Sequence, residues 1–238
     1  MTCWNCERDA RDEAVCGFCG KLQPLARDAD HFTVMGFSRR YAVLRDEVDT
    51  RFRELSRRFH PDRLARESAE ERRIALQRTV ALNDAYRVLR DDVKRGEYLL
   101  KLWGIDVGAE KSGQASAIGL GGGFLMEMLE RREALLEARA AGDRGTEERL
   151  FAEAREARAA ALERAAAGLD EEEEKGDRKE GAGPGAGAGA DAGADAETGA
   201  VAVAGALAGE GAGRLGEVAR EFARIRYYAR FLGEAADD

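Results

Sequence analysis

The stretch YAVLRDEVDTRFRELSRRFHPDR, residues 41–63, carries an amphipathic pattern that ends abruptly in a histidine, a proline and an aspartate. Its apolar residues recur at spacings of three and four, as they do on the buried face of a helix. Proline and the residue before it both resist helical geometry, so we expect the helix to stop there and an exposed corner to follow. The predicted buried stripe consists of Leu44, Val48, Phe52, Leu55 and Phe59.

A second helical pattern follows in SAEERRIALQRTVALNDAYRVLRDD, residues 68–92. It begins with Ser68 and, three residues later, Glu71, which is a capping-box signature. Two such helices joined by HPDRLARE predict an antiparallel hairpin with its loop in water. The shorter patterns DHFTVMG and KRGEYLLKLWG are expected to cover the open end of this hairpin. The predicted buried stripe of the second helix is Ile74, Ala81, Leu82, Ala85, Val88 and Leu89.

The histidine at the corner has no serine or cysteine nucleophile beside it in the sequence. A lone His near an Asp is more often a turn or hydrogen-bonding device than a general base, so a recognition surface is favoured over a hydrolytic site. Arg53 and Arg57 lie four residues apart on the polar face of the preceding helix. A basic face of this kind speeds encounter with an acidic partner.

The whole chain has 238 residues, a net charge of −8 and only three prolines. The acidic balance disfavours a general nucleic-acid binder, and no apolar run approaches the roughly 20 residues of a membrane span. The abundance of Ala, Leu, Arg and Glu favours helix, so we predict an all-α protein with neither nucleic-acid nor membrane partners. The N-terminal MTCWNCERD lacks a basic region followed by an apolar core, which favours the cytoplasm, or the mitochondrial matrix if the source is eukaryotic.

Composition divides the chain into four segments. Residues 1–26 hold all four cysteines, 28–104 are densely amphipathic, 105–123 form a Gly-rich hinge, and 124–238 carry three further helical patterns. At about 168–213 the last segment is interrupted by a Gly-, Ala- and acid-rich tract with almost no large apolar residues. Such a tract cannot bury enough surface to offset its ordering entropy, so we predict a disordered insertion.

The cysteines form two CxxC pairs separated by nine residues. Two such pairs can complete a tetrahedron of thiolates around Zn²⁺, and four sulfur ligands leave no open position, so the metal would be structural. Redox dithiols or two local disulfides are the alternatives, although cytoplasmic thiols stay reduced. The predicted zinc ligands are Cys3, Cys6, Cys16 and Cys19.

The pattern FLMEMLERREALLEAR, residues 124–139, has a wider apolar arc than packing in a bundle requires. Met and Leu in excess of core needs are typical of an adaptable protein-binding surface, and a fully buried helix is the alternative. The last pattern, residues 214–232, places Tyr227 and Phe231 on a face other than its predicted core stripe. With the Ala-rich pattern at 146–168, these segments predict a three-helix bundle.

The hairpin resembles the J-domain family in its basic second helix, its HPD tripeptide, the NDAY at residues 83–86 and the KRGEYLL at 94–100. J-domains deliver substrates to DnaK-class chaperones and stimulate their ATP hydrolysis. The resemblance implies that His60, Pro61 and Asp62 carry the stimulation. It also implies that the basic residues Arg53, Arg57 and Arg58 favour docking on the chaperone.

The order of all parts resembles one J-protein family, the HscB iron–sulfur cluster co-chaperones, through CWNC, CGFCGKLQP, HPD, RGEYLLKLWGI and FLMEMLERREAL. This resemblance implies a non-enzymatic co-chaperone that binds an IscU-type scaffold protein and brings it to a HscA/DnaK-class chaperone. A J-protein for other clients, or a metal or iron–sulfur carrier using the four cysteines, is the alternative. The implied scaffold-binding residues are Leu125, Met126, Leu129 and Tyr227, with Tyr228 as the alternative to Tyr227.

Overall fold

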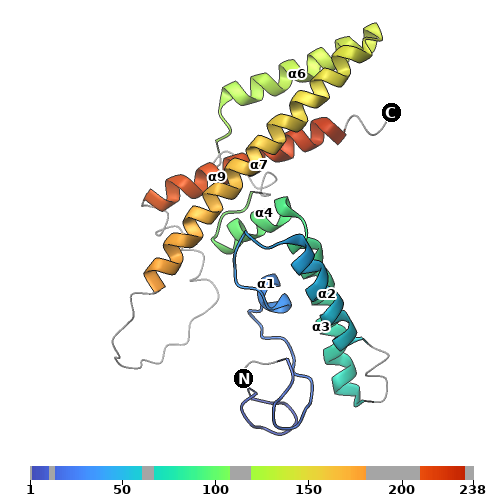
Figure 1. Cartoon of the computed structure of the whole chain (residues 1–238), viewed down its shortest axis with the longest axis vertical. Coiled ribbons are helices and arrows are strands. Elements are labelled where there is room, and N and C mark those ends of the chain that lie inside the picture. The colour runs from blue at the N-terminus through green and yellow to red at the C-terminus, as the bar shows by residue number, and fades with distance from the viewer. Residues whose placement is uncertain (1, 11–13, 61–66, 108–118, 181–209, 234–238) are drawn as a thin grey trace. The chain divides into compact units, whose positions relative to one another are not determined.

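A computed structural model describes residues 2–10, 14–60, 67–107, 119–180 and 210–233 (Figure 1). Within these ranges the chain forms seven helices and no strand, so the predicted all-α class is confirmed. None of these helices combines the length and the apolar character that crossing a membrane requires. The helices are α1 (His31–Met35), α2 (Arg45–Phe59), α3 (Ala69–Leu89), α4 (Asp92–Leu102), α6 (Gly122–Ala141), α7 (Arg144–Glu180) and α9 (Glu210–Gly233).

The chain divides into two compact units, Met1–Arg95 and Gly96–Asp238. In the first unit, α2 and α3 lie side by side and run antiparallel, and α1 packs against α3 (Figure 1). The hydroxyl of Ser68 accepts a hydrogen bond from the Glu71 amide at 3.2 Å, which confirms the predicted cap of α3. The buried faces largely follow the predicted spacing and include Val48, Leu55, Phe59, Ile74, Leu82, Ala85 and Leu89.

One member of the predicted stripe is wrong. Leu44 is the N-cap of α2, in extended backbone geometry, and its side chain is 68% exposed. The reason is that Leu44 precedes the first helical residue, so the rotation of about 100° per residue that places Val48 inside does not apply to it.

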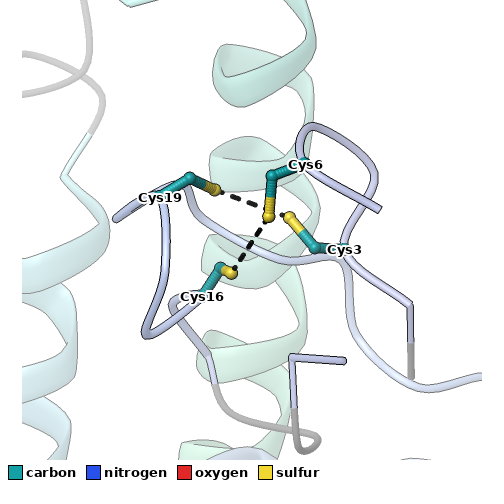
Figure 2. A group of neighbouring side chains, drawn as sticks. All are labelled: Cys3, Cys6, Cys16 and Cys19. Carbon is teal, nitrogen blue, oxygen red and sulfur yellow. Dashed lines mark hydrogen bonds between the residues drawn. The ribbon is translucent and has the colours of Figure 1, made fainter. Parts of the chain in front are cut away.

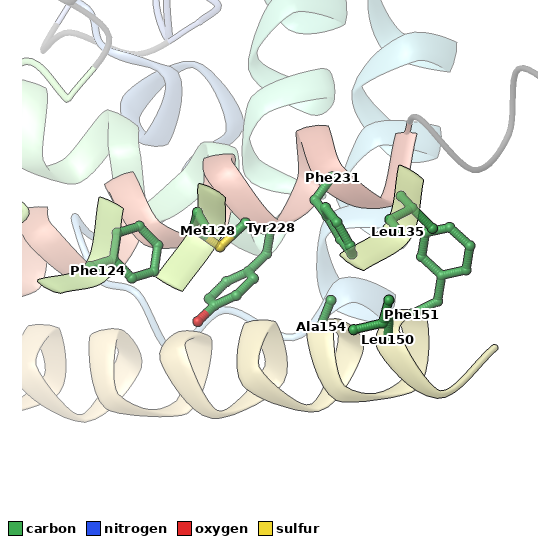
Figure 3. Close-up of a cluster of buried hydrophobic side chains, with 8 residues drawn as sticks. All are labelled: Phe124, Met128, Leu135, Leu150, Phe151, Ala154, Tyr228 and Phe231. Atoms are coloured by element: carbon green, nitrogen blue, oxygen red, sulfur yellow. The ribbon is translucent and has the colours of Figure 1, made fainter. Parts of the chain in front are cut away.

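In the second unit, α6, α7 and α9 pack as a three-helix bundle, and each contributes side chains to one apolar cluster (Figure 3). The turn between α6 and α7 is short because Gly142 takes the left-handed conformation (φ 69°) that ends α6. The carboxylate of Asp143 then accepts a hydrogen bond from the Thr146 amide at 3.0 Å and caps α7. The cluster comprises Phe124, Met128, Leu135, Leu150, Phe151, Ala154, Tyr228 and Phe231.

Small residues let α7 and α9 approach closely. Ala161 and Ala165 are fully buried on α7, and Gly168 lies so near Val218 that a Cβ at this glycine would overlap the valine side chain. The only glycine of α4 has a comparable role, because a methyl group at Gly96 would overlap the buried ring of Phe222 on α9.

The predicted start of the disordered insertion, near residue 168, is wrong. Helix α7 continues to Glu180, and Leu169 is completely buried. The reason is that Leu169 packs into the bundle core, and the residues after it are largely strong helix formers that continue the helix. At the other boundary α9 begins at Glu210. Residues 181–209 lie outside the described ranges, so their disorder stays a prediction.

Two further predictions concern Phe231 and the hinge. Phe231 was placed with Tyr227 on a non-core face, but it is 4% exposed and belongs to the bundle core. It contacts Phe151 with ring centroids 5.7 Å apart, so packing against α7 decided its position. Most of the predicted hinge, residues 108–118, lies outside the described ranges.

Candidate functional site

The helix that leads to the HPD tripeptide ends where the sequence predicted. Helix α2 stops at Phe59, and His60 is its C-cap, with φ −59° and ψ 130°. This extended geometry is the one that a residue before proline adopts. The side chain of His60 is exposed. Pro61 and Asp62 lie outside the described residues, so the role of the tripeptide stays a prediction.

The three predicted docking arginines, Arg53, Arg57 and Arg58, are all exposed on α2. Arg53 lies along the helix, where its Nε donates to the Asp49 carbonyl at 3.1 Å and its Nη2 donates to the Thr50 hydroxyl at 3.2 Å. Positive charges in the last turn are also favoured by the helix dipole. The basic side chains therefore face solvent close to the exposed end of α2, as a surface that attracts an acidic partner requires.

A polar and aromatic contact holds α2 against α3 behind this surface. The Asp49 carboxylate accepts hydrogen bonds from Arg90 Nε at 2.8 Å and from the Tyr86 hydroxyl at 2.9 Å. These bonds, that of Arg90 first, hold the pKa of Asp49 below its usual value. Burial and the bond to Asp49 raise the pKa of Tyr86. The ring of Phe52 stacks on Tyr86 with centroids 4.0 Å apart, so the register of the hairpin is fixed.

The four cysteines converge at one point (Figure 2). All four sulfurs lie within 4.8 Å of one another, and none of the four cysteines is in a disulfide. The Sγ atoms of Cys3 and Cys19 are 3.6 Å apart, and those of Cys6 and Cys16 are 3.7 Å apart. Four thiolates about 2.3 Å from a tetrahedral Zn²⁺ would form edges of about 3.8 Å. The cluster therefore fits a tetrahedral metal ion.

The two CxxC turns repeat the same backbone geometry. In the first, the Glu7 amide donates to the Cys3 carbonyl at 3.0 Å, and in the second the Gly20 amide donates to the Cys16 carbonyl at 2.9 Å. Both residues have positive φ, 61° and 69°, which glycine adopts more easily than glutamate. The repeated turn places each pair of sulfurs on the same side, as two halves of one site.

The local environment lowers the pKa of one cysteine thiol and raises that of another. Burial opposes ionisation of Cys3, but hydrogen bonds from the backbone amides of Cys6 and Asn5 and from neighbouring thiols lower its pKa to about 6. For Cys6 the Arg8 amide favours the thiolate, but burial and the adjoining thiols outweigh it and raise the pKa to about 11. Four thiolates this close would repel one another. A divalent cation would offset that repulsion, because metal ligation deprotonates thiols. The sulfur-only donor set suits Zn²⁺ but also iron.

Helix α6 presents an apolar face that its own bundle leaves uncovered. Leu125, Met126 and Leu129 are 45%, 57% and 50% exposed, whereas Phe124 and Met128 on the same helix are buried. The fully buried alternative for α6 is therefore wrong. Surface clusters of this kind mark contact sites for other proteins.

The structure distinguishes the two tyrosines that the sequence left open. Tyr228 is buried in the bundle core, and burial raises its pKa. Tyr227 is half-buried and lies edge-on to Phe124, with ring centroids 5.9 Å apart. Tyr227 is thus the tyrosine accessible beside the exposed α6 residues. The binding role of these residues stays a prediction.

A shallow groove of about 270 Å³ runs between α6 and α9 beside this face. Sequence reasoning missed two of its residues, Arg132 and Arg230, both of which are exposed. The guanidinium of Arg230 lies 5.5 Å from the centroid of the Tyr227 ring. A spacing of seven from Leu125 could have indicated that Arg132 shares its face. The groove is lined by Leu125, Met128, Leu129, Arg132, Tyr227, Arg230 and Phe231.

Comparison with known families gives a match for the helical hairpin. Residues 30–98 match the family model described as DnaJ domain. This range holds α1, α2, α3 and most of α4. The chain therefore contains a J-domain, as its hairpin and motifs predicted.

Among curated proteins, the chain is similar to the co-chaperone protein HscB homolog of Ralstonia nicotianae, with 42% identity over 113 residues. The match covers 48% of this chain and 61% of the relative, which is less than two thirds of the relative's length. The resemblance to HscB co-chaperones that the motifs indicated is thereby confirmed.

Two solved structures share the fold. The human co-chaperone protein HscB superimposes with a TM-score of 0.68 at 20% identity, covering 99% of this chain and 97% of that one. The chaperone HscB from Vibrio cholerae gives a TM-score of 0.57 at 22% identity, covering 88% and 96%. At these identities the similarity concerns the fold alone.

Proposed function

We propose that this chain, which contains a J-domain and resembles HscB co-chaperones, is an adaptor for iron–sulfur cluster transfer. In this proposal the J-domain binds an HscA/DnaK-class chaperone and stimulates its ATPase, while the α6–α9 face binds an IscU-type scaffold. The observation that carries the proposal is the exposed trio Leu125, Met126 and Leu129 beside Tyr227, in a chain that also presents HPD after a basic helix. The chain itself would catalyse no reaction.

At the chaperone end, the hairpin supplies a rigid platform. Helix α2 directs Arg53, Arg57 and Arg58 into solvent, and these charges would orient an approaching acidic surface before close contact. Charge steering is screened by salt, so the association rate should fall as ionic strength rises. His60, Pro61 and Asp62 would then make the contacts that the chaperone couples to ATP hydrolysis.

At the scaffold end, the exposed side chains of α6 would act as anchors. Leu and Met side chains adapt to the shape of a partner, and an aromatic residue beside them adds contact area at low entropic cost. Arg132 and Arg230 border the groove, so a complementary partner would place an apolar side chain between carboxylates. Bound this way, the scaffold would be carried to the chaperone by a single protein.

The decisive experiment measures ATP hydrolysis by an HscA/DnaK-class chaperone with and without this protein and an IscU-type scaffold. The wild-type protein should raise the rate, and His60→Gln should abolish the increase while leaving the helical melt unchanged. His60 is exposed at the end of α2, so its replacement removes no core contact. Stimulation retained by His60→Gln would refute the docking role, and a wild-type protein without stimulation would refute the proposed function.

The cysteine cluster is proposed to hold Zn²⁺ as a structural ion. The sulfur separations fit a tetrahedron. The four cysteines would fill all four positions around such an ion, so none would be open to substrate. Metal analysis of anaerobically purified protein should find about one zinc per chain. An iron–sulfur absorbance band with little zinc would instead favour the carrier alternative.

A J-protein for other clients is the second candidate, because an exposed apolar face does not by itself name its partner. Affinity capture with the wild-type protein and with the triple variant Leu125→Ala, Met126→Ala, Leu129→Ala separates the two. Loss of a cluster scaffold from the captured proteins supports the leading proposal. Loss of a different client in its place supports the alternative.

A further inference from the structure

The segment that holds the four cysteines is connected to the start of α3 by hydrogen bonds, and to the end of α2 by a hydrogen bond to Arg78, whose guanidinium contacts the Phe59 ring. The segment that carries HPD leaves α2 after Phe59, and the chain is described again from Glu67, directly before the Ser68 cap of α3. No coordination position of the cluster is left for chemistry if it holds a tetrahedral ion. Its contacts with α2 and α3 therefore suggest what the cluster is for.

The first connection runs through Lys21, two residues after Cys19. The carbonyl of Lys21 accepts a hydrogen bond from the Cys16 amide at 2.9 Å, so its position depends on the second CxxC turn. Its Nζ donates to Glu71 at 2.7 Å and to Glu67 at 3.0 Å. The Glu71 side chain is only 4% exposed, and a buried carboxylate without a cation is costly. Lys21 thus attaches the cysteine turn to the start of α3.

The second connection runs through Gln23 and Arg78. The Gln23 amide donates to the Ala14 carbonyl at 2.9 Å, two residues before Cys16. The Gln23 carbonyl accepts a hydrogen bond from Arg78 Nε at 2.6 Å. Arg78 is buried on α3, and its guanidinium lies 5.3 Å from the centroid of the Phe59 ring. The cysteine turn is thereby joined to the last residue of α2.

We infer that the metal-loaded cysteine cluster positions the end of α2 and the start of α3, between which the sequence carries HPD, with Lys21 and Arg78 as the positioning residues. The cysteine segment, residues 1–26, is too short to keep its turns without a metal or another cross-link. If the turns loosen, Lys21 and the Gln23 carbonyl are no longer fixed, and both helix ends gain freedom. The chaperone would then have to order these ends on binding, which weakens affinity.

The test compares Lys21→Met with Lys21→Arg and with the control Arg73→Met, all in the full chain. Lys21→Met removes the contacts to Glu67 and Glu71 without changing a cysteine. Arg73→Met removes the ion pair between Arg73 and Glu70 on α3, which is 2.6 Å long and so of similar closeness. No ion pair or hydrogen bond of Arg73 with the four cysteines is described. The readouts are zinc content, amide exchange at residues 67–72, and the concentration of protein that half-maximally stimulates the chaperone ATPase.

We expect Lys21→Met to keep its zinc, although its melting temperature should fall because the buried Glu71 carboxylate loses its cation. Exchange at residues 67–72 should accelerate, and the half-maximal concentration should rise roughly three- to tenfold because the segment is less preorganised. The maximal ATPase rate should be unchanged. The zinc content of the purified variant separates this effect from an inactive misfolded fraction, which would also raise the apparent half-maximal concentration. Lys21→Arg should restore both readouts, and chelation of the wild type should reproduce the loss.

The inference is overturned if Lys21→Met behaves like Arg73→Met, or if chelation removes the zinc and leaves both exchange and half-maximal concentration as they were. It rests on the proposed function, because HPD must act on a chaperone for its positioning to matter. The two fail differently. Absence of stimulation by the wild type refutes the function, whereas full stimulation by wild type and Lys21→Met alike refutes only the positioning.

Discussion

The exposed face of α6 supports a quantitative prediction for binding of an IscU-type scaffold. Leu125, Met126 and Leu129 keep about half of their surface accessible in the bundle. Complete burial of such a side chain contributes about 1.5–3 kcal/mol, so covering the remaining half contributes about 1 kcal/mol each. Alanine retains one methyl group, and the triple replacement should therefore cost about 2–3 kcal/mol, which corresponds to roughly 30- to 150-fold in Kd.

The assay is titration calorimetry of the scaffold with wild-type protein and with the triple alanine variant. Alanine is a strong helix former and the three side chains face away from the core, so the thermal melt should be preserved. The matched control is Leu76→Ala with Val80→Ala on α3. These side chains are similarly exposed, at 60% and 53%, but they belong to the J-domain. The control should bind the scaffold as tightly as the wild type.

Equal affinity of the wild type and the triple variant would refute this reasoning. The exposed residues of α6 would then be tolerated surface apolar residues rather than anchors. An equally large loss of affinity in the Leu76, Val80 control would show that general surface hydrophobicity, and not the α6 face, drives association.

Two further predictions concern stability. Gly96→Ala should destabilise the protein by about 1–2 kcal/mol in urea melts, because overlap with Phe222 outweighs the higher helix propensity of alanine, whereas Gly123→Ala, which meets open space, should be neutral or stabilising. The pKa of Asp49 is lowered in the folded state, first by Arg90 and then by Tyr86, so its contribution is present above its unfolded-state value of about 3.9 and is lost as pH falls through the folded value. Asp49→Asn should therefore lower the melting temperature at pH 7 and flatten its decline on acidification; an unchanged pH profile would contradict this role.

Much of the fold was predictable because local patterns have direct physical consequences. Spacings of three and four placed Val48, Leu55 and Leu82 in the core, and the Ser68 cap follows from the hydrogen-bonding needs of a helix start. The CxxC spacing predicted the convergence of four sulfurs, which the structure shows within 4.8 Å. These features depend on residues near one another in sequence.

The errors occurred where local pattern and packing disagree. The spacing within the last helix places Phe231 on an outer face, but Phe151 on α7 buries it. The Gly168–Leu169 pair looked like the start of a linker, but contact with Val218 and complete burial keep it within the bundle. Neither contact can be read from the spacing within one helix.

By itself, the sequence determined the helical class, the cysteine cluster, the end of α2 before HPD and the composition of the α6 face. Each depends on periodicity, on proline geometry or on metal-ligand spacing, which operate over a few residues. Only the tertiary structure decided that Tyr227 rather than Tyr228 is accessible, and that Lys21 and Arg78 join the cysteine turns to the ends of α2 and α3. The Lys21 and Arg78 contacts join residues 46 to 55 apart in the sequence, and Tyr228 packs against Phe124 from another helix. Burial and pairing across such separations are set by packing of the whole fold.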